Sequence, residues 1–180
     1  MSADDPLRRI RICTQRDISV IRHIAVVTWP VAYAKILSKG QLHYMLDLMY
    51  SERVLQLQFE QGQQFLLSEE GARPLGFASV EHNYKGTRKT RLHKLYVLPE
   101  TQGTGVGKQL LDAVIRSAEI ASDERIELNV NKFNTAKEFY LRSGFTIVRD
   151  EVLDIGEGFV MDDHVMELLL HHLLQIQLLL

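Results

Sequence analysis

The segment Leu95-Tyr-Val-Leu-Pro-Glu-Thr-Gln-Gly-Thr-Gly-Val-Gly-Lys108 decides the fold class of this 180-residue chain. Pro99 closes a strand-like apolar run, and three glycines at alternate positions then lead into a helix with an apolar face. Free N–H groups at the start of a helix bind anions, and glycine lets a phosphate approach because it lacks a Cβ atom. The segment therefore predicts a phosphate-binding loop, with Lys108 as an additional cation.

Three phosphate-loop patterns compete for this segment. A Walker loop needs glycine at position 102 and serine or threonine at position 109, where this chain has Gln102 and Gln109. A dinucleotide fingerprint needs glycine at Lys108. The pattern Gln/Arg-x-x-Gly-x-Gly/Ala is met by Gln102, Gly105 and Gly107, and here the chain resembles the acetyl-CoA loop of the GNAT superfamily of N-acetyltransferases. A glycine-rich turn that only connects strand and helix is the structural alternative.

A second segment, residues 128–145, supports the same resemblance. It places Asn134 before a helix, Phe139-Tyr140 on that helix and Gly144-Phe145 after it, about thirty residues beyond the glycine loop. Taken alone, these residues are an ordinary N-cap and an ordinary apolar helix face. The two segments together extend the resemblance over residues 92–145.

The rest of the chain predicts an α+β domain. Hydrophobic periodicity predicts helices near 18–30, 38–49 and 51–62, and two more around 110–118 and 135–142. The predicted strands are 9–14, 65–67, 75–80, 92–98, 125–130, 145–148 and 159–168. The resemblance implies a mixed, largely antiparallel seven-stranded sheet flanked by helices, whose fourth and fifth strands splay apart. No repeat or linker appears, so we expect one domain over residues 1–180.

The resemblance also implies that acetyl-CoA is the acyl donor. Its pantetheine would lie between the splayed strands and pair with the backbone of the fourth strand, and its pyrophosphate would lie on the loop amides. The expected cofactor contacts are Leu95, Tyr96, Val97, Gln102, Gly103, Thr104, Gly105, Val106, Gly107, Lys108 and Asn134.

Acetyl transfer to an amine needs a base for the amine and a proton donor for the departing thiolate. His93 occupies a position where some relatives place a catalytic histidine, and Glu81 on the neighbouring strand is the second candidate base. Tyr140 occupies the position of the tyrosine near the CoA sulfur. A half-buried strand histidine and a core aromatic residue are the structural alternatives for His93 and Tyr140. A backbone N–H of the fourth strand, at Leu95 or Val97, would polarise the acetyl carbonyl.

Composition argues against several other classes. The 21 Lys and Arg residues nearly balance the 23 Asp and Glu residues, which argues against a nucleic-acid binder. No apolar run reaches about 18 residues and the first residues are polar, so we expect no membrane span, no secretory signal and a cytoplasmic protein. Cys13 is the only cysteine, and the adjacent His171 and His172 have no evident partner ligand, so we expect no disulfide within the chain and no metal.

The acceptor is less well defined. Residues 29–34, 46–50, 93–97 and 154–163 resemble a bacterial branch that includes polyamine (spermidine/spermine) acetyltransferases, which implies a small-molecule primary amine. The acidic residues of 150–163 form either a solvated face or a binding surface for a polycation. A protein N-terminal or lysine acetyltransferase and a non-catalytic acyl-CoA-binding sensor remain as alternatives. The apolar tail 169–180 could extend the last strand, form a helix or cover a second copy in a homodimer.

Overall fold

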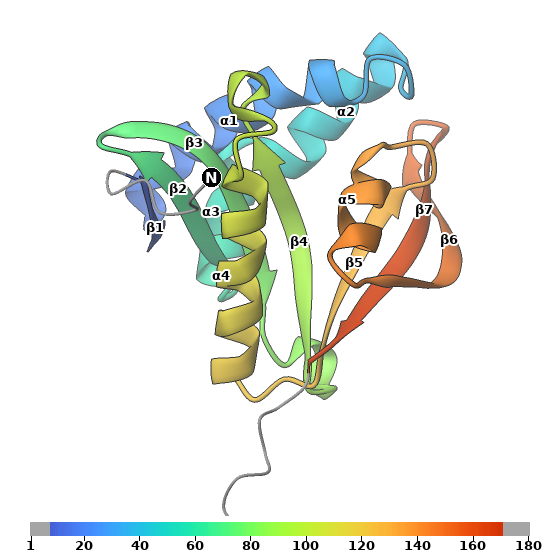
Figure 1. Cartoon of the computed structure of the whole chain (residues 1–180). Helices are drawn as coiled ribbons and strands as arrows, with labels where there is room; N and C mark the ends of the chain where they lie inside the picture. Colours follow the sequence, from blue (N-terminus) through green and yellow to red (C-terminus); the bar gives the residue numbers. More distant parts are fainter. Residues whose placement is uncertain (1–7, 171–180) are drawn as a thin grey trace, which may run out of the picture.

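The structure, a computed structural model, describes residues 8–170, and seven strands of this range form one mixed sheet (Figure 1). The strands are β1 Arg8–Ile12, β2 Gln64–Glu70, β3 Arg73–Glu81, β4 Lys89–Val97, β5 Arg125–Asn131, β6 Thr146–Gly156 and β7 Phe159–Leu169. Their order in the sheet is β1-β2-β3-β4-β5-β7-β6, and only the β4–β5 pair is parallel. The predicted fold class, a largely antiparallel seven-stranded sheet with flanking helices, is confirmed.

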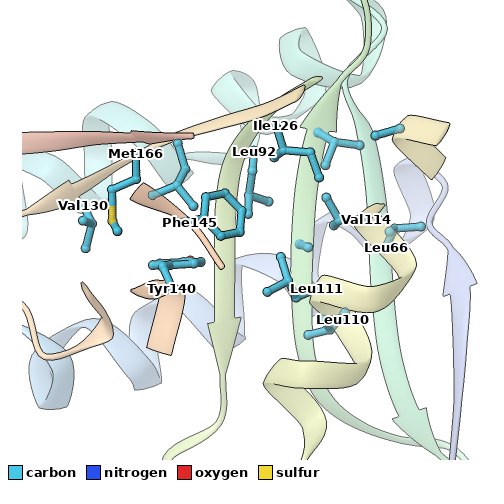
Figure 2. Packing of buried hydrophobic residues seen from close by; sticks show 14 of the residues in the cluster. Leu66, Leu92, Leu110, Leu111, Val114, Ile126, Val130, Tyr140, Phe145 and Met166 are labelled. Atoms are coloured by element: carbon cyan, nitrogen blue, oxygen red, sulfur yellow. The ribbon is translucent and has the colours of Figure 1, made fainter. Parts of the chain in front are cut away.

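Helices cover both faces of this sheet. They are α1 Ile18–Ala32, α2 Lys39–Tyr50, α3 Glu52–Glu60, α4 Val106–Ile120 and α5 Ala136–Arg142. One apolar cluster joins α4 and α5 to the sheet through residues such as Leu110 and Tyr140 (Figure 2). A second cluster joins α1, α2 and α3 to the opposite face through Trp29, Met45 and Leu55. The phosphate-loop helix and the first three helices therefore lie on opposite sides of the sheet (Figure 1).

Two sequence predictions need correction. The first helix was predicted to end near Pro30, but α1 continues to Ala32, because proline removes only one backbone hydrogen bond and the N–H of Tyr33 still bonds the Trp29 carbonyl at 2.9 Å. The strand predicted over 145–148 is longer, because β6 stays paired with β7 as far as Gly156. Ser38 caps α2 as predicted.

The parallel strands β4 and β5 stay together over only three residue pairs, from Lys89↔Arg125 to Arg91↔Glu127. Beyond that point they diverge, and the rest of β4 faces a gap on its β5 side (Figure 1). The Glu127 carboxylate, 3% exposed, lies where they part. It accepts hydrogen bonds from Lys89 at 2.8 Å, Arg91 at 2.9 Å and Arg149 of β6 at 3.3 Å. The splayed strands implied by the family resemblance are therefore present.

A β-bulge lies on β4 just beyond this point. Ser79 of β3 is paired with Lys94 and the next residue, Val80, with Leu92, so His93 is an extra residue in the ladder. Leu92 and Leu95 both pack in the cluster under α4, which leaves His93 and Lys94 between them on the opposite face. The bulge thus presents two consecutive polar side chains on the face covered by α1, α2 and α3.

Residues 171–180, which hold most of the predicted apolar tail and both adjacent histidines, lie outside the described residues. Within residues 8–170, none of the helices has the length and apolar character that crossing a membrane requires.

Candidate active site

A cleft with a volume of about 640 Å³ lies where β4 and β5 diverge. Nine of the predicted cofactor residues line it: Leu95, Tyr96, Val97, Gln102, Gly103, Gly105, Gly107, Lys108 and Asn134. The other two do not. Val106 is fully buried in the core, and the Thr104 hydroxyl donates to the Thr101 carbonyl at 2.6 Å. The cleft therefore brings together the two segments that carried the resemblance.

The glycine loop at one end of the cleft suits an anion. Gly103 and Gly105 have φ angles of +77° and +89°, in the left-handed region that favours glycine, and α4 starts directly after Gly105. The first helical hydrogen bond runs from the Gln109 N–H to the Gly105 carbonyl, so the N–H groups before Gln109 have no acceptor within the helix. The Arg8 guanidinium donates to the Thr104 carbonyl at 2.9 Å and holds the loop from outside. This loop can therefore receive a pyrophosphate on its backbone amides.

Besides Lys94, two cations line the cleft, Lys108 and Arg142. Lys108, predicted as the additional cation, instead pairs with Asp112 at 2.7 Å, but its side chain is 73% exposed and free to turn. Arg142, in the last turn of α5, was not predicted. Both can contribute positive charge for the phosphates of a CoA molecule.

A second cavity, of about 410 Å³, lies on the face of the sheet covered by α1, α2 and α3. Five residues line both cavities, and we call them the throat: Tyr33, His93, Lys94, Tyr96 and Asn129. Only His93 and Tyr96 were predicted as site residues. A group held in the cleft and a group held in the second cavity can meet only at the throat.

His93 and Glu81, the two alternative bases of the sequence analysis, form one pair. The His93 Nε2 lies 3.1 Å from a Glu81 carboxylate oxygen, and the Tyr84 ring packs edge-on against the imidazole. Burial lowers the pKa of His93 to about 4, although the hydrogen bond to Glu81 acts in the opposite direction. The imidazole is therefore neutral at physiological pH, so it can accept a proton.

Tyr140 lies on the cleft side of the sheet. Its ring packs edge-on against Phe139 and Phe145, and Figure 2 shows it beneath Phe145 in the core cluster. The residue is 8% exposed and lines the cleft, and burial raises the pKa of its hydroxyl. The phenol thus stays protonated and can donate, but not accept, a proton near neutral pH.

The sequence profile of the acetyltransferase (GNAT) domain matches residues 37–163, most of the chain. This protein belongs to the GNAT acetyltransferases. It is accordingly an enzyme that transfers an acetyl group from acetyl-CoA to an amine. Among residues 8–170, no group of three or more His, Cys, Asp and Glu side chains is placed to hold a metal ion.

Relatives and solved structures agree with this membership. An uncharacterized N-acetyltransferase from Mycobacterium tuberculosis is 27% identical over 142 residues, which cover 78% of this chain and 90% of that protein. The PaiA N-acetyltransferase from Thermoplasma acidophilum, solved with coenzyme A, superimposes with a TM-score of 0.74 at 22% identity, over 89% of this chain and 97% of that one. A spermidine N-acetyltransferase (SpeG) chimera from Vibrio cholerae and hSSAT gives a TM-score of 0.65 at 18% identity, over 91% and 95%. These two structures show a shared fold.

The second cavity of this GNAT protein is closed on one side by contacts between α2 and the β6–β7 hairpin. The Tyr44 hydroxyl donates to the Ile155 carbonyl at 2.6 Å, and Gln41 donates to the Val160 carbonyl at 2.9 Å. Gly156 permits this approach, because a Cβ atom there would lie 2.8 Å from the Tyr44 hydroxyl oxygen. The contacts hold the hairpin over the cavity.

Of the six acidic residues of 150–163, four do not line the second cavity, Asp150, Asp154, Glu157 and Asp162, and two do. Asp150 and Asp162 pair with Lys132, and neither lines the second cavity. Glu151 and Asp163 do line it, and the Asn129 amide donates to Glu151 at 2.7 Å. Asp163 is 4% exposed, and burial raises the pKa of its carboxyl. Only two of the acidic side chains singled out in the sequence are therefore placed to meet a ligand.

We predict that Gly105→Val weakens CoA binding by roughly 10- to 100-fold, because a branched side chain stands where hydrogen bonds to a phosphate would form. Isothermal titration calorimetry measures this. Gly71→Val is the matched control: Gly71 is also left-handed with open surroundings, at φ +60°, but lies in the β2–β3 turn. Both variants should lose about 1–2 kcal/mol of stability from backbone strain. Equal CoA affinities in the two variants would contradict the assignment of the loop.

Proposed function

We propose that this protein acetylates a primary amine of a small molecule that binds in the second cavity. The observation that carries the proposal is the throat, where five residues line both the cleft for acetyl-CoA and the second cavity. A volume of about 410 Å³ is in the range of small-molecule sites. An acceptor screen with acetyl-CoA and detection of the released thiol tests this function, and turnover of peptides but of no small amine would contradict it.

In the proposed reaction, neutral His93, oriented by Glu81, removes a proton from the acceptor ammonium group. The amine nitrogen then attacks the thioester carbonyl, so that a C–N bond forms and the C–S bond breaks. A backbone N–H of Leu95 or Val97, on the unpaired side of β4, stabilises the oxyanion. Tyr140 donates its proton to the leaving thiolate and is reprotonated by the proton that the acetylated nitrogen loses.

Two alternatives have less support. A protein acetyltransferase needs an open path for a peptide, and the contacts of Tyr44 and Gln41 with the hairpin narrow the second cavity on that side. A non-catalytic acyl-CoA sensor does not need a neutral His93 at the throat or a protonated Tyr140 at the cleft. The cytoplasm remains the expected compartment on composition alone.

A polyamine is the narrower acceptor class that the sequence resemblance favours. It needs carboxylates that bind its additional ammonium groups, and Glu151 and Asp163 are the hairpin carboxylates that line the second cavity. The likeness to the spermidine acetyltransferase chimera is one of fold, so this hypothesis depends on the two carboxylates.

We predict that the acidic limb of the kcat/KM profile lies near pH 4, because burial lowers the pKa of His93 to about 4. His93→Ala should lower kcat/KM about 100-fold and abolish the limb. Glu81→Gln should move the limb to lower pH, because the hydrogen bond to Glu81 raises the pKa of His93. His164→Ala, outside both cavities, is the control, and an unchanged limb in His93→Ala would assign the base to another group.

Tyr140→Phe should lower kcat by about 10² to 10⁴, the usual contribution of a general acid, and change CoA affinity less than about twofold because the ring still packs. Steady-state kinetics and calorimetry measure the two effects. Tyr50→Phe is the matched control, since Tyr50 is buried but lines neither cavity. A loss no larger than that of the control would mean that solvent protonates the thiolate.

If the acceptor is a polyamine, the double variant Glu151→Gln, Asp163→Asn should raise KM for spermine about tenfold more than KM for butylamine, and added salt should reduce the difference. Asp162→Asn is the control, because Asp162 pairs with Lys132 and lines neither cavity. Equal changes for spermine and butylamine would count against a polyamine acceptor.

A further inference from the structure

One wall of the second cavity carries a buried cation that the reaction above does not use. Lys94 is 5% exposed and lines the cavity beside Gln58 of α3. Its Nζ donates to the Gln58 side-chain oxygen at 3.0 Å and lies 5.4 Å from the centre of the Tyr50 ring. Among residues 8–170, no carboxylate forms an ion pair with it. Buried charges in proteins are normally paired, so this ammonium group lacks an anion.

The two glutamines of this wall are oriented by their partners. An ammonium group only donates, so Gln58 must turn its oxygen to Lys94, which leaves the Gln58 NH₂ group as a donor. The Ser79 hydroxyl donates to the Gln63 side-chain oxygen at 3.0 Å. The Gln63 NH₂ group is therefore also left as a donor. Both glutamines line the cavity. The wall thus offers N–H donors from three side chains, the donor set that a carboxylate binds.

The opposite part of the cavity has the reverse charge. Glu151 and Asp163 come from β6 and β7, beyond β5 in the sheet, whereas Lys94 comes from β4 and faces α3. Arg91 also lines the cavity, but its guanidinium already binds Glu127 at 2.9 Å and Asn129 at 2.8 Å. Burial lowers the pKa of Lys94 to about 8, which still leaves it mostly protonated at neutral pH. The cavity therefore has a cationic and an anionic end.

We infer that the acceptor carries a carboxylate as well as its primary amine, and that Lys94 with Gln58 and Gln63 binds this carboxylate. The inference rests on the proposed amine acetylation and narrows its substrate class. A zwitterionic acceptor complements both ends of the cavity, with its ammonium group toward Glu151 and Asp163 before deprotonation. A polyamine would bring only positive charge into a cavity that already holds the Lys94 ammonium group. It is the alternative acceptor that the experiment distinguishes from a zwitterion.

The test compares matched acceptors that differ only in the carboxylate: ornithine with putrescine, and tyrosine with tyramine. Initial rates with acetyl-CoA and thiol detection give kcat/KM for each. We expect kcat/KM to be at least about tenfold higher for ornithine and tyrosine, the scale of a hydrogen bond to a charged group. In Lys94→Met this preference should disappear: the kcat/KM ratios of ornithine to putrescine and of tyrosine to tyramine should both fall to about one through higher KM values for the two acids. Because Lys94 lies at the throat, the ratio within each pair is the readout, since a general effect on the reaction changes both members of a pair alike.

A second variant tests the same inference if Lys94→Met does not fold. Gln58→Glu keeps the lysine but supplies its missing anion from within the protein, so it should also abolish the preference. Lys132→Met is the matched control, because Lys132 pairs with Asp150 and Asp162, lines neither cavity and should keep the preference.

The outcomes separate the inference from the proposed function. Acetylation of putrescine and tyramine at least as efficiently as of ornithine and tyrosine would overturn the inference and leave amine acetylation standing. A preference that persists in both Lys94→Met and Gln58→Glu would also overturn it. If a folded protein that binds CoA acetylates none of the four amines or any other in the acceptor screen, the proposed function is wrong and the inference fails with it.

Discussion

The Glu127 carboxylate lies at the point where β4 and β5 part, and the rest of the site depends on it. Burial alone would raise its pKa, but the hydrogen bond from Lys89 and the charge of Arg91 outweigh burial and lower it, so it stays ionised. With Arg149, it joins three strands through side-chain contacts where β4 and β5 make their last backbone pair. Such a clamp lets the strands separate beyond Glu127 without loosening the sheet below it. The cleft proposed for acetyl-CoA begins within two residues of this clamp, at Leu92 and Leu128.

The bulge at His93 lies on the part of β4 that is no longer paired with β5. In a regular strand, His93 and Lys94 would point to opposite faces, and one of them would enter the apolar cluster under α4. The extra residue instead places both on the face of the second cavity while Leu95 returns to the α4 side. It also sets His93 beside Glu81 of β3. One inserted residue thus supplies both the proposed base and the cation of the acceptor wall.

The cofactor half of the site was largely predictable because its signals are local. Gly103 and Gly105 lie in the loop between strand and helix that their spacing predicted, and Tyr140 lies on a predicted helix, in the apolar cluster. Pairing between distant elements was not predictable. His93 and Glu81 were alternatives in the sequence, and only the register of β3 and β4 shows that they form one pair. The end of α1 was misplaced because Pro30 removes only one backbone hydrogen bond and the helix continues past it to Ala32.

The acceptor half of the site is built from elements that are far apart in the sequence. Its residues were therefore difficult to predict from the sequence. Three of the five throat residues were missed: Tyr33 directly after α1, Lys94 from the bulge and Asn129 from β5. They converge only in the folded sheet, and most of the remaining lining of the second cavity comes from α1, α2, α3 and the β6–β7 hairpin, outside the contiguous segment proposed to bind the cofactor. Substitutions in those elements can change the charge of the second cavity without touching the glycine loop. A chain can therefore keep its acetyl donor while its acceptor changes, so the acceptor has to be inferred from the charges of the second cavity and not from the loop.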